Sequence, residues 1–224
     1  MTSSDLTAEG FVRPEVRAAQ VAFWSALADS GSQWTGSQRV AIASQARAAF
    51  ARRHDPPWMR SLADDTEDLP AAATAAARKI AADAAQIDRE WASGIIEQLG
   101  DAAYVELTAV AACVVGLDVF GLALGLEPRP LPIPDPGSET RDERPNVVDA
   151  GAYVPLESPW SGPNVGRALS LAPADNGRFR ALVDAMYAGG AGRGFMNLVW
   201  DGPLTRPQVE LVAARVSALN ECFY

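Results

Sequence analysis

The sequence predicts an all-α fold made of two related helical repeats joined by a proline-rich segment. Alternating runs of Val, Ile and Thr, which indicate strands, are scarce in its 224 residues. Alanine-rich segments with apolar residues at helical spacing dominate instead. Because 48% of the residues are hydrophobic, the chain has ample material for a core, which excludes a disordered protein.

The first two helices are defined by their stop and cap signals. Apolar residues at helical spacing predict a helix over residues 14–30, and Gly31 follows as a stop. A second helix begins at Thr35, with Gln38 three residues further on, which is the capping-box pattern. It ends near residue 53, because two prolines follow shortly and proline cannot continue a helix.

The next three helices lie close together in the sequence. Pro70 suits the first turn of a helix that reaches about residue 83, another covers residues 88–99, and the most apolar covers residues 102–124. The last is long enough to span a membrane. However, it contains Glu106 and Asp118, and each acid at mid-membrane depth costs about 3 kcal/mol. The sequence therefore predicts a buried core helix.

Composition changes after Gly125. Nine prolines fall between residues 128 and 163, which indicates an extended linker or a long surface loop. Helices are expected again over residues 174–188 and from Thr205, where Gln208 completes a second capping box. We divide the chain into an N-terminal repeat (1–127), a proline-rich linker (128–163) and an incomplete C-terminal repeat (164–224).

The net charge and the N-terminal residues limit the possible functions. The net charge of −9 argues against nucleic acid and against an anionic membrane surface as partners. The first ten residues lack a basic region followed by an apolar run, so we expect no signal peptide and a cytoplasmic protein. Two cysteines do not make a disulfide framework, and Cys113, inside the apolar helix, is expected to be a small core residue.

The two capped helices match each other at an offset of 170 residues. Thr35-Gly-Ser-Gln-Arg-Val-Ala-Ile-Ala aligns with Thr205-Arg-Pro-Gln-Val-Glu-Leu-Val-Ala, and Ala48 aligns with Ala218. This match favours an internal duplication. The alternative is a pair of ordinary amphipathic helices rich in alanine.

The C-terminal copy carries a more specific pattern. Glu210 and Cys222 are twelve residues apart, and Ser-Ala-Leu-Asn-Glu precedes the cysteine. This run resembles the motif of the alkylhydroperoxidase D/carboxymuconolactone decarboxylase family, in which a glutamate is followed by Cys-x-x-Cys and then a histidine. Residues 69–132 also look like the helical body of peroxidase-related members. In the N-terminal copy, Arg52, Asp55 and Met59 stand where the two cysteines and the histidine would be, so that copy is expected to serve packing.

The resemblance implies thiol chemistry without a metal or another cofactor. The second cysteine would attack a hydroperoxide or a protein disulfide, Cys222 would resolve the product, Glu210 would relay protons, and a thiol would supply electrons. A homo-oligomer is expected, because such repeats leave apolar faces uncovered. The sequence reaches Tyr224, one residue before the position of the second cysteine, so the chain as given is expected to be inactive or severely impaired.

A selenocysteine codon is one hypothesis for that end point. A selenol is a better nucleophile than a thiol at neutral pH, and the attacking position is where it would be useful. A frameshift, a pseudogene and a trimmed chain are the competing explanations. The genomic sequence beyond Tyr224 decides between them, because the hypothesis requires UGA followed by a histidine codon four positions further on.

Three other interpretations remain open. The chain could be a catalytically dead helical scaffold or oligomer partner, in which Glu210 is an ordinary solvated helix residue. It could also be a lactone decarboxylase on the same fold, although that chemistry needs no cysteine pair. His54, the single histidine, could act as a base, but a histidine at a helix end more often binds the last carbonyls, and one histidine argues against a metal site built by the protein.

Overall fold

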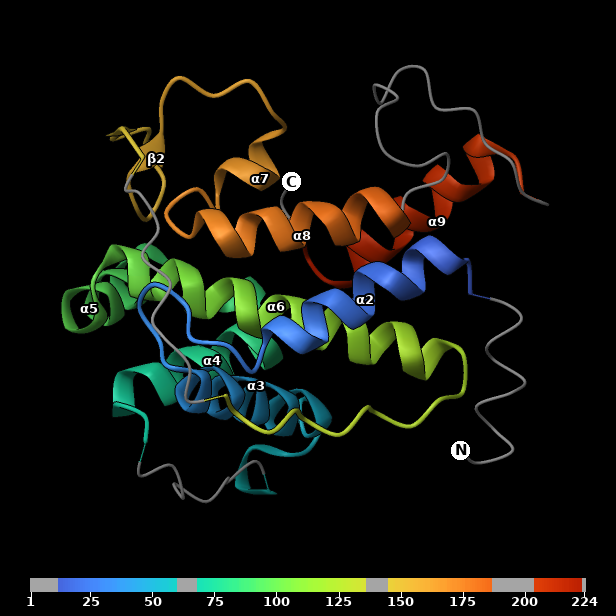
Figure 1. Cartoon of the computed structure of the whole chain (residues 1–224), viewed down its shortest axis with the longest axis horizontal. Helices are drawn as coiled ribbons and strands as arrows, with labels where there is room; N and C mark the ends of the chain where they lie inside the picture. Colours follow the sequence, from blue (N-terminus) through green and yellow to red (C-terminus); the bar gives the residue numbers. More distant parts are fainter. Residues whose placement is uncertain (1–11, 60–67, 136–144, 187–203, 223–224) are drawn as a thin grey trace.

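The described residues form an all-α structure, which confirms the predicted fold class. The computed structural model describes residues 12–59, 68–135, 145–186 and 204–222 (Figure 1). The α-helices of these residues are α2 (Pro14–Ala26), α3 (Gly36–Ala51), α4 (Ala71–Asp83), α5 (Arg89–Leu99), α6 (Asp101–Ala123), α7 (Asn164–Arg167), α8 (Pro173–Met186) and α9 (Arg206–Leu219). Two short 3-10 turns, Pro57–Met59 and Ala84–Gln86, follow α3 and α4.

The apolar helix α6 is the centre of the molecule. It contacts α3, α4, α5 and α8, while α2 and α8 pack against each other above it (Figure 1). The core between α3 and α4 is built largely from alanines, which let the two helices approach closely. On α3 these are Ala43, Ala46 and Ala49, and on α4 they are Ala72, Ala73, Ala76 and Ala77.

Three of the predicted helix starts, those of α3, α5 and α9, carry side-chain caps. Thr35 N donates to Gln38 Oε1 at 3.0 Å and Gln38 N donates to Thr35 Oγ1 at 3.3 Å, which completes the capping box of α3. The same box begins α9, where Thr205 N donates to Gln208 Oε1 at 2.7 Å. Asp88 caps α5 by accepting a hydrogen bond from Trp91 N at 2.8 Å.

The first helix ends earlier than predicted, at Ala26 instead of near residue 30. Gly31 does not directly follow the helix but lies in the connection to α3, where its N–H donates to Trp34 O at 2.8 Å. A Cβ at Gly31 would lie only 1.9 Å from Glu106 Oε1. Gly31 is therefore required for close approach of the backbone to a buried carboxylate, a role that its position in the sequence does not reveal.

The proline-rich segment contains a small hairpin that the sequence analysis missed. Strand β1 (Val147–Val148) pairs antiparallel with β2 (Leu156–Glu157). The described part of the segment is also tied to the helices, because Trp24 Nε1 donates to Pro130 O at 3.0 Å and Asp135 N donates to Ala28 O at 2.9 Å. Of the two alternatives, these contacts fit a surface loop.

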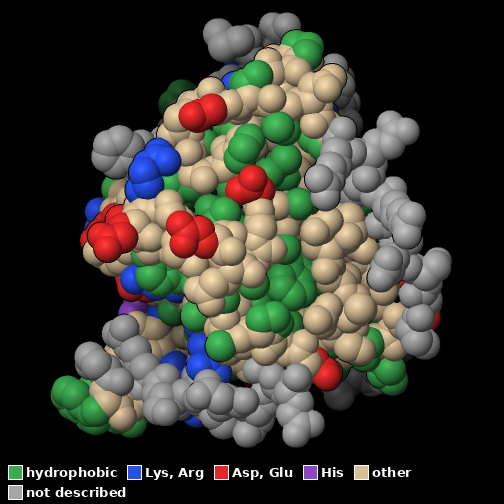
Figure 2. All heavy atoms as spheres, turned by 90° about the vertical axis from the view of Figure 1, so that its left-hand side faces the viewer, with side chains coloured by type: hydrophobic (Ala, Val, Ile, Leu, Met, Phe, Trp, Pro, Cys, Tyr) green, Lys and Arg blue, Asp and Glu red, His purple; other side chains and the backbone are tan. Residues whose placement is uncertain are grey.

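Helix α6 is the one helix of the described residues that is long and apolar enough to cross a membrane. In this structure half of its most apolar stretch is buried within the protein, and its acids Glu106 and Asp118 are paired with arginines. On the side of the molecule drawn in Figure 2, Asp and Glu side chains stand apart among hydrophobic and uncharged ones. The negative charge is thus spread over this face rather than gathered in one patch.

Helix α9 differs from α3 in its burial, although both begin with the same capping box. None of its residues is buried, whereas α3 buries seven, including Ile42 and Ala46. The aligned residues Val212 and Val216 are 57% and 50% exposed. The duplication itself stays a prediction, because a shared cap and a shared spacing occur in unrelated helices as well.

Candidate functional site

Cys222 lies just beyond the end of α9 and carries an exposed, free thiol. Helix α9 ends at Leu219 with Asn220 as its C-cap, and Glu221 adopts a left-handed conformation with φ of 52°. Cys222 N then donates to Ser217 O at 2.9 Å and Glu221 N donates to Ala218 O at 3.3 Å, which together form a Schellman motif.

Glu210 lies in the second turn of α9 and is half exposed. Its Oε1 atom is 3.4 Å from Arg206 Nε, one turn earlier on the same helix. Nine residues of helix, about 14 Å at 1.5 Å per residue, separate Glu210 from Leu219. Glu210 thus lies near the start of α9 and Cys222 beyond its end, so the described residues do not bring the two predicted site residues together.

The N-terminal counterparts of the motif lie at the end of α3. Arg52 and Met59 are exposed, and Asp55 is partly exposed. His54 is exposed as well, and the side chain that reaches the last carbonyls of α3 is that of Arg53, whose Nη1 donates to Phe50 O at 2.8 Å. Within the described ranges, no three His, Cys, Asp or Glu side chains form a group that could hold a metal ion.

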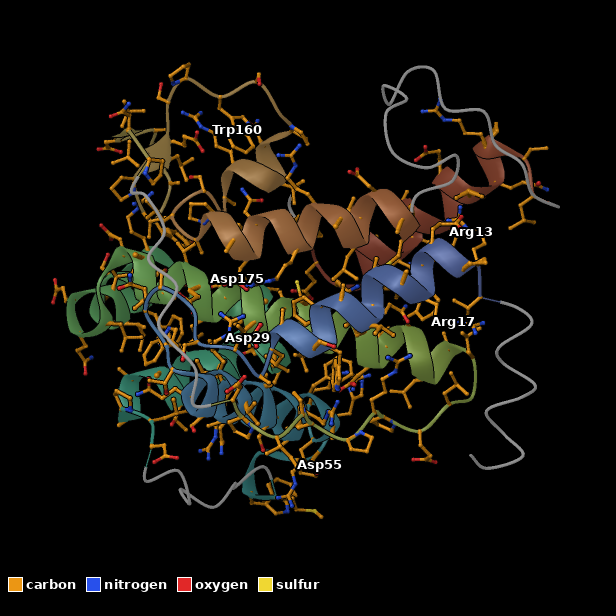
Figure 3. All side chains as sticks on the ribbon, in the orientation of Figure 1. Arg13, Arg17, Asp29, Asp55, Trp160 and Asp175 are labelled. Atoms are coloured by element: carbon orange, nitrogen blue, oxygen red, sulfur yellow. The ribbon has the colours of Figure 1, made fainter. Side chains whose placement is uncertain are left out.

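The structure also assembles a buried charged cluster that the sequence analysis missed. Arg39 of α3 donates to Glu106 of α6 at 2.8 Å and forms a two-pronged pair with Asp175 of α8, at 2.8 and 2.9 Å. Asp175 lies between α8 and the helices below it (Figure 3). The exposed fractions of the three residues are 1%, 0% and 3%, so no substrate reaches them in this structure.

Further donors satisfy the two carboxylates of this cluster. Glu106 Oε2 accepts hydrogen bonds from Ser32 Oγ at 3.0 Å and from Gln33 N at 2.9 Å. Asp175 Oδ1 also accepts from Arg178 Nη1 at 3.0 Å, at the edge of the cluster. Burial by itself would lower the pKa of Arg39, but the hydrogen bonds and charges of Asp175 and Glu106 outweigh it and raise the pKa above its usual value. Arg39 is therefore a permanent cation that joins three helices.

Cys113 lies two helical turns beyond Glu106 on α6 and is a core residue, as predicted. Burial raises the pKa of its thiol to about 12, the charge of Asp175 acts in the same direction, and the charge of Arg39 opposes both. Since the thiolate is the nucleophile in thiol chemistry, Cys113 is inert near neutral pH. Of the two thiols, only that of Cys222 is exposed to a substrate.

Part of this cluster has a signal in the sequence. Glu106 is an acid within an apolar helix, and Arg39 lies one turn before Ile42 on the same face of α3, so a buried pair could be anticipated from both. Asp175 has no such signal, because it lies 136 residues from its partner. A scan against protein-family models, a search of curated proteins and a search of solved structures each found no match for this chain.

Proposed function

We propose that this chain is a thiol redox protein of the alkylhydroperoxidase D type, acting on hydroperoxides or protein disulfides. The observation that carries the proposal is the contrast between an exposed Cys222 and a buried Cys113. A cysteine that packs in a core needs no reactivity, whereas an exposed cysteine at a helix end is accessible to a disulfide or a peroxide. The spacing of Glu210 and Cys222 supports the same class.

The simplest step open to Cys222 is disulfide exchange. Its thiolate attacks one sulfur of a disulfide substrate, forms a mixed disulfide and releases the other sulfur as a thiolate. An external thiol then attacks the mixed disulfide on the sulfur of the bound group, which returns Cys222 to its reduced form. With a hydroperoxide, Cys222 would become a sulfenic acid and release an alcohol, and two external thiols would restore it with loss of water.

Glu210 requires a further residue to take part. At its place on α9 it is too far along the helix from Cys222 to exchange a proton with that thiol directly. The resemblance puts the attacking cysteine or selenocysteine three positions beyond Cys222, on a helix that returns along α9. Glu210 would then serve as the proton relay for that residue, while Arg206 holds its carboxylate.

The test measures hydroperoxide consumption with dithiothreitol as the thiol donor, and compares the chain as given with an extended chain and its variants. The chain as given is expected to be impaired, and a chain extended beyond Tyr224 through the complete motif is expected to be active. In the extended chain, Cys222→Ser should lose most of the activity, and Glu210→Gln should lower it. Cys113→Ala is the matched control and should retain it. Equal activity of the extended chain and its Cys222→Ser variant would refute the proposal.

A second candidate is a helical scaffold or homo-oligomer partner, and one observation favours it. Helix α9 exposes four large apolar side chains, each at least half exposed: Leu211, Val212, Val216 and Leu219. Apolar residues gathered on one helix indicate an interaction surface. Sedimentation of the protein at several concentrations tests it. If the protein is a monomer at every concentration and the extended chain is active, only the redox proposal stands.

A further inference from the structure

Residues 127–135, which follow α6, form an extended rod along the outside of the helices (Figure 1). Each of these residues is a proline or directly precedes one, because prolines occupy positions 128, 130, 132, 134 and 136. A proline ring fixes φ at about −65°, and the residue before a proline is restricted to extended or polyproline II conformations. The sequence of this rod therefore makes it stiff.

Two hydrogen bonds to successive carbonyls indicate the form of the rod. Arg47 Nη1 donates to Arg129 O at 2.8 Å, and Trp24 Nε1 donates to Pro130 O at 3.0 Å. Both donors come from the same side, because the guanidinium of Arg47 lies 5.3 Å from the centre of the Trp24 ring. Successive carbonyls of a β-strand point to opposite sides, whereas a polyproline II helix turns by one third of a turn per residue. The two bonds therefore fit a polyproline II helix.

One side of the rod packs on the protein, and the other side is open. Leu131 packs against the hydrophobic core. Pro130 and Ile133, which share an edge of a helix with three residues per turn, are exposed. Ile133 is 90% exposed, the highest value for a large apolar side chain among the described residues. Within the same part of the chain, the carbonyls of Leu131, Pro132 and Ile133 accept no hydrogen bond. The rod thus combines exposed apolar side chains with unused acceptors.

The rod also carries one exposed arginine. The side chain of Arg129 forms no ion pair or hydrogen bond with the residues that the structure describes. Glu127 and Asp135 lie at the two ends of the rod, so the rod has no excess of positive charge. Arg129 is therefore suited to orient a partner through one acidic contact, and it does not attract partners over a long range.

We propose that residues 128–134 are the docking site for a protein domain whose aromatic-lined groove binds polyproline II helices. Aromatic rings of the groove pack against Pro130 and Ile133, their N–H or O–H groups donate to the unused carbonyls, and an acid of the partner pairs with Arg129. The rod is stiff and bonded to α2 and α3, so little conformational entropy is lost when the partner binds. This docking needs no thiol chemistry and is independent of the proposed function.

The test measures binding of the chain to two purified probes, a Src-homology 3 domain and a WW domain, by isothermal titration calorimetry. We expect at least one probe to bind. Ile133→Ala should weaken its affinity by about tenfold, because an apolar contact is lost. Pro130→Ala should also weaken it, because the ring is lost while the carbonyl that Trp24 binds is kept. Leu211→Ala, at a side chain of α9 that is 71% exposed, is the matched control and should bind as the parent does.

A second pair of variants tests the charged contact. Arg129→Gln should weaken binding by at least threefold, whereas Arg215→Gln, the same change at an exposed position of α9, should not. Equal effects of the two changes would contradict the assigned orientation of the partner and overturn the inference. Failure of both probes to bind, or binding that neither Ile133→Ala nor Pro130→Ala weakens, would overturn it as well.

Trp24→Phe distinguishes docking on the rod from removal of the rod from the protein. This change deletes the indole donor to Pro130 O, so the affinity for the probe should stay the same or decrease as the rod becomes less rigid. Tighter binding by Trp24→Phe would mean that the partner must first detach the rod from α2. That result would overturn the inference, because the docking side would then not be the open one.

Discussion

At the scale of single residues, the two cysteines differ in what surrounds the sulfur. Cys113 is packed in the core near Asp175, whereas Cys222 lies exposed past the end of α9. Removing water from a thiol penalises its charged form, and a nearby carboxylate penalises it further. The same side chain is therefore a packing residue at one position and a candidate nucleophile at the other.

The burial of Cys113 predicts a pH dependence of stability. Its pKa in the folded protein, about 12, is raised above the value of an unfolded chain, about 8.5. The folded state thus holds this proton more tightly, so its contribution to stability is complete below the unfolded pKa and is lost as pH rises through the window between the two values. By pH 10, 1.5 pH units above the unfolded pKa, the loss should be about 2 kcal/mol.

Denaturation by urea at pH 7.5 and pH 10, in a reducing buffer, measures this loss. Cys113→Ala should be less stable at both pH values, because it leaves a small cavity, but its stability should fall less between them. Cys222→Ala changes an exposed thiol and serves as the control. Its stability should decrease between the two pH values by as much as that of the wild type. An unchanged fall in Cys113→Ala would show that this thiol is not the titrating group.

At the scale of elements, the same capping box begins two helices that contribute unequally to the buried core. Thr35 starts α3, which buries seven residues in the core, and Thr205 starts α9, which buries none. A helix that contributes no buried residue can open without disturbing the remainder of the fold. The energetic effect of a cap therefore depends on what its helix packs against.

The two threonines can be compared directly by the same substitution. Thr35→Ala should lower the free energy of global unfolding by about 1 kcal/mol, a usual effect of losing an N-cap. Thr205→Ala should leave global unfolding within about 0.5 kcal/mol of the parent while hydrogen exchange in α9 becomes faster. Urea denaturation and exchange mass spectrometry provide the two measurements. Equal effects on global unfolding would mean that α9 is part of the cooperative core.

At the scale of the whole molecule, Arg39, Glu106 and Asp175 connect α3, α6 and α8. This cluster anchors residues 173–186 to the N-terminal helices, together with the contacts between α2 and α8. Arg13 adds a second anchor at the far end of α8, where its Nη2 donates to Ala185 O at 2.7 Å. The charges are satisfied within the cluster, so removing one partner leaves another buried without compensation.

Asp175→Ala should therefore destabilise the fold by about 3–5 kcal/mol, as expected when a buried ion pair loses one member. Asp83→Ala, which removes the acid of the half-exposed pair with Lys79, is the matched control and should cost less than about 1 kcal/mol. Urea denaturation of both variants gives the comparison. A small effect at Asp175 similar to that at Asp83 would show that α8 is held by apolar packing alone.

The sequence by itself determined the helical class and most helix boundaries. The capping boxes of Thr35 with Gln38 and of Thr205 with Gln208, and the long apolar run of α6, are local signals, and local backbone hydrogen bonding follows them. It also identified Cys113 as a core residue. The early end of α2 was missed, because the turn that replaces its last residues depends on the connection to α3.

Only the tertiary structure decided which charged groups meet. Arg39 and Asp175 are 136 residues apart, and nothing in the spacing of either predicts the other. The fold also decided that Gly31 must approach Glu106, and that Glu210 lies near the start of α9 while Cys222 lies beyond its end. The physical reason is that burial and electrostatic pairing depend on distances between helices, and these distances are set by packing rather than by any local pattern.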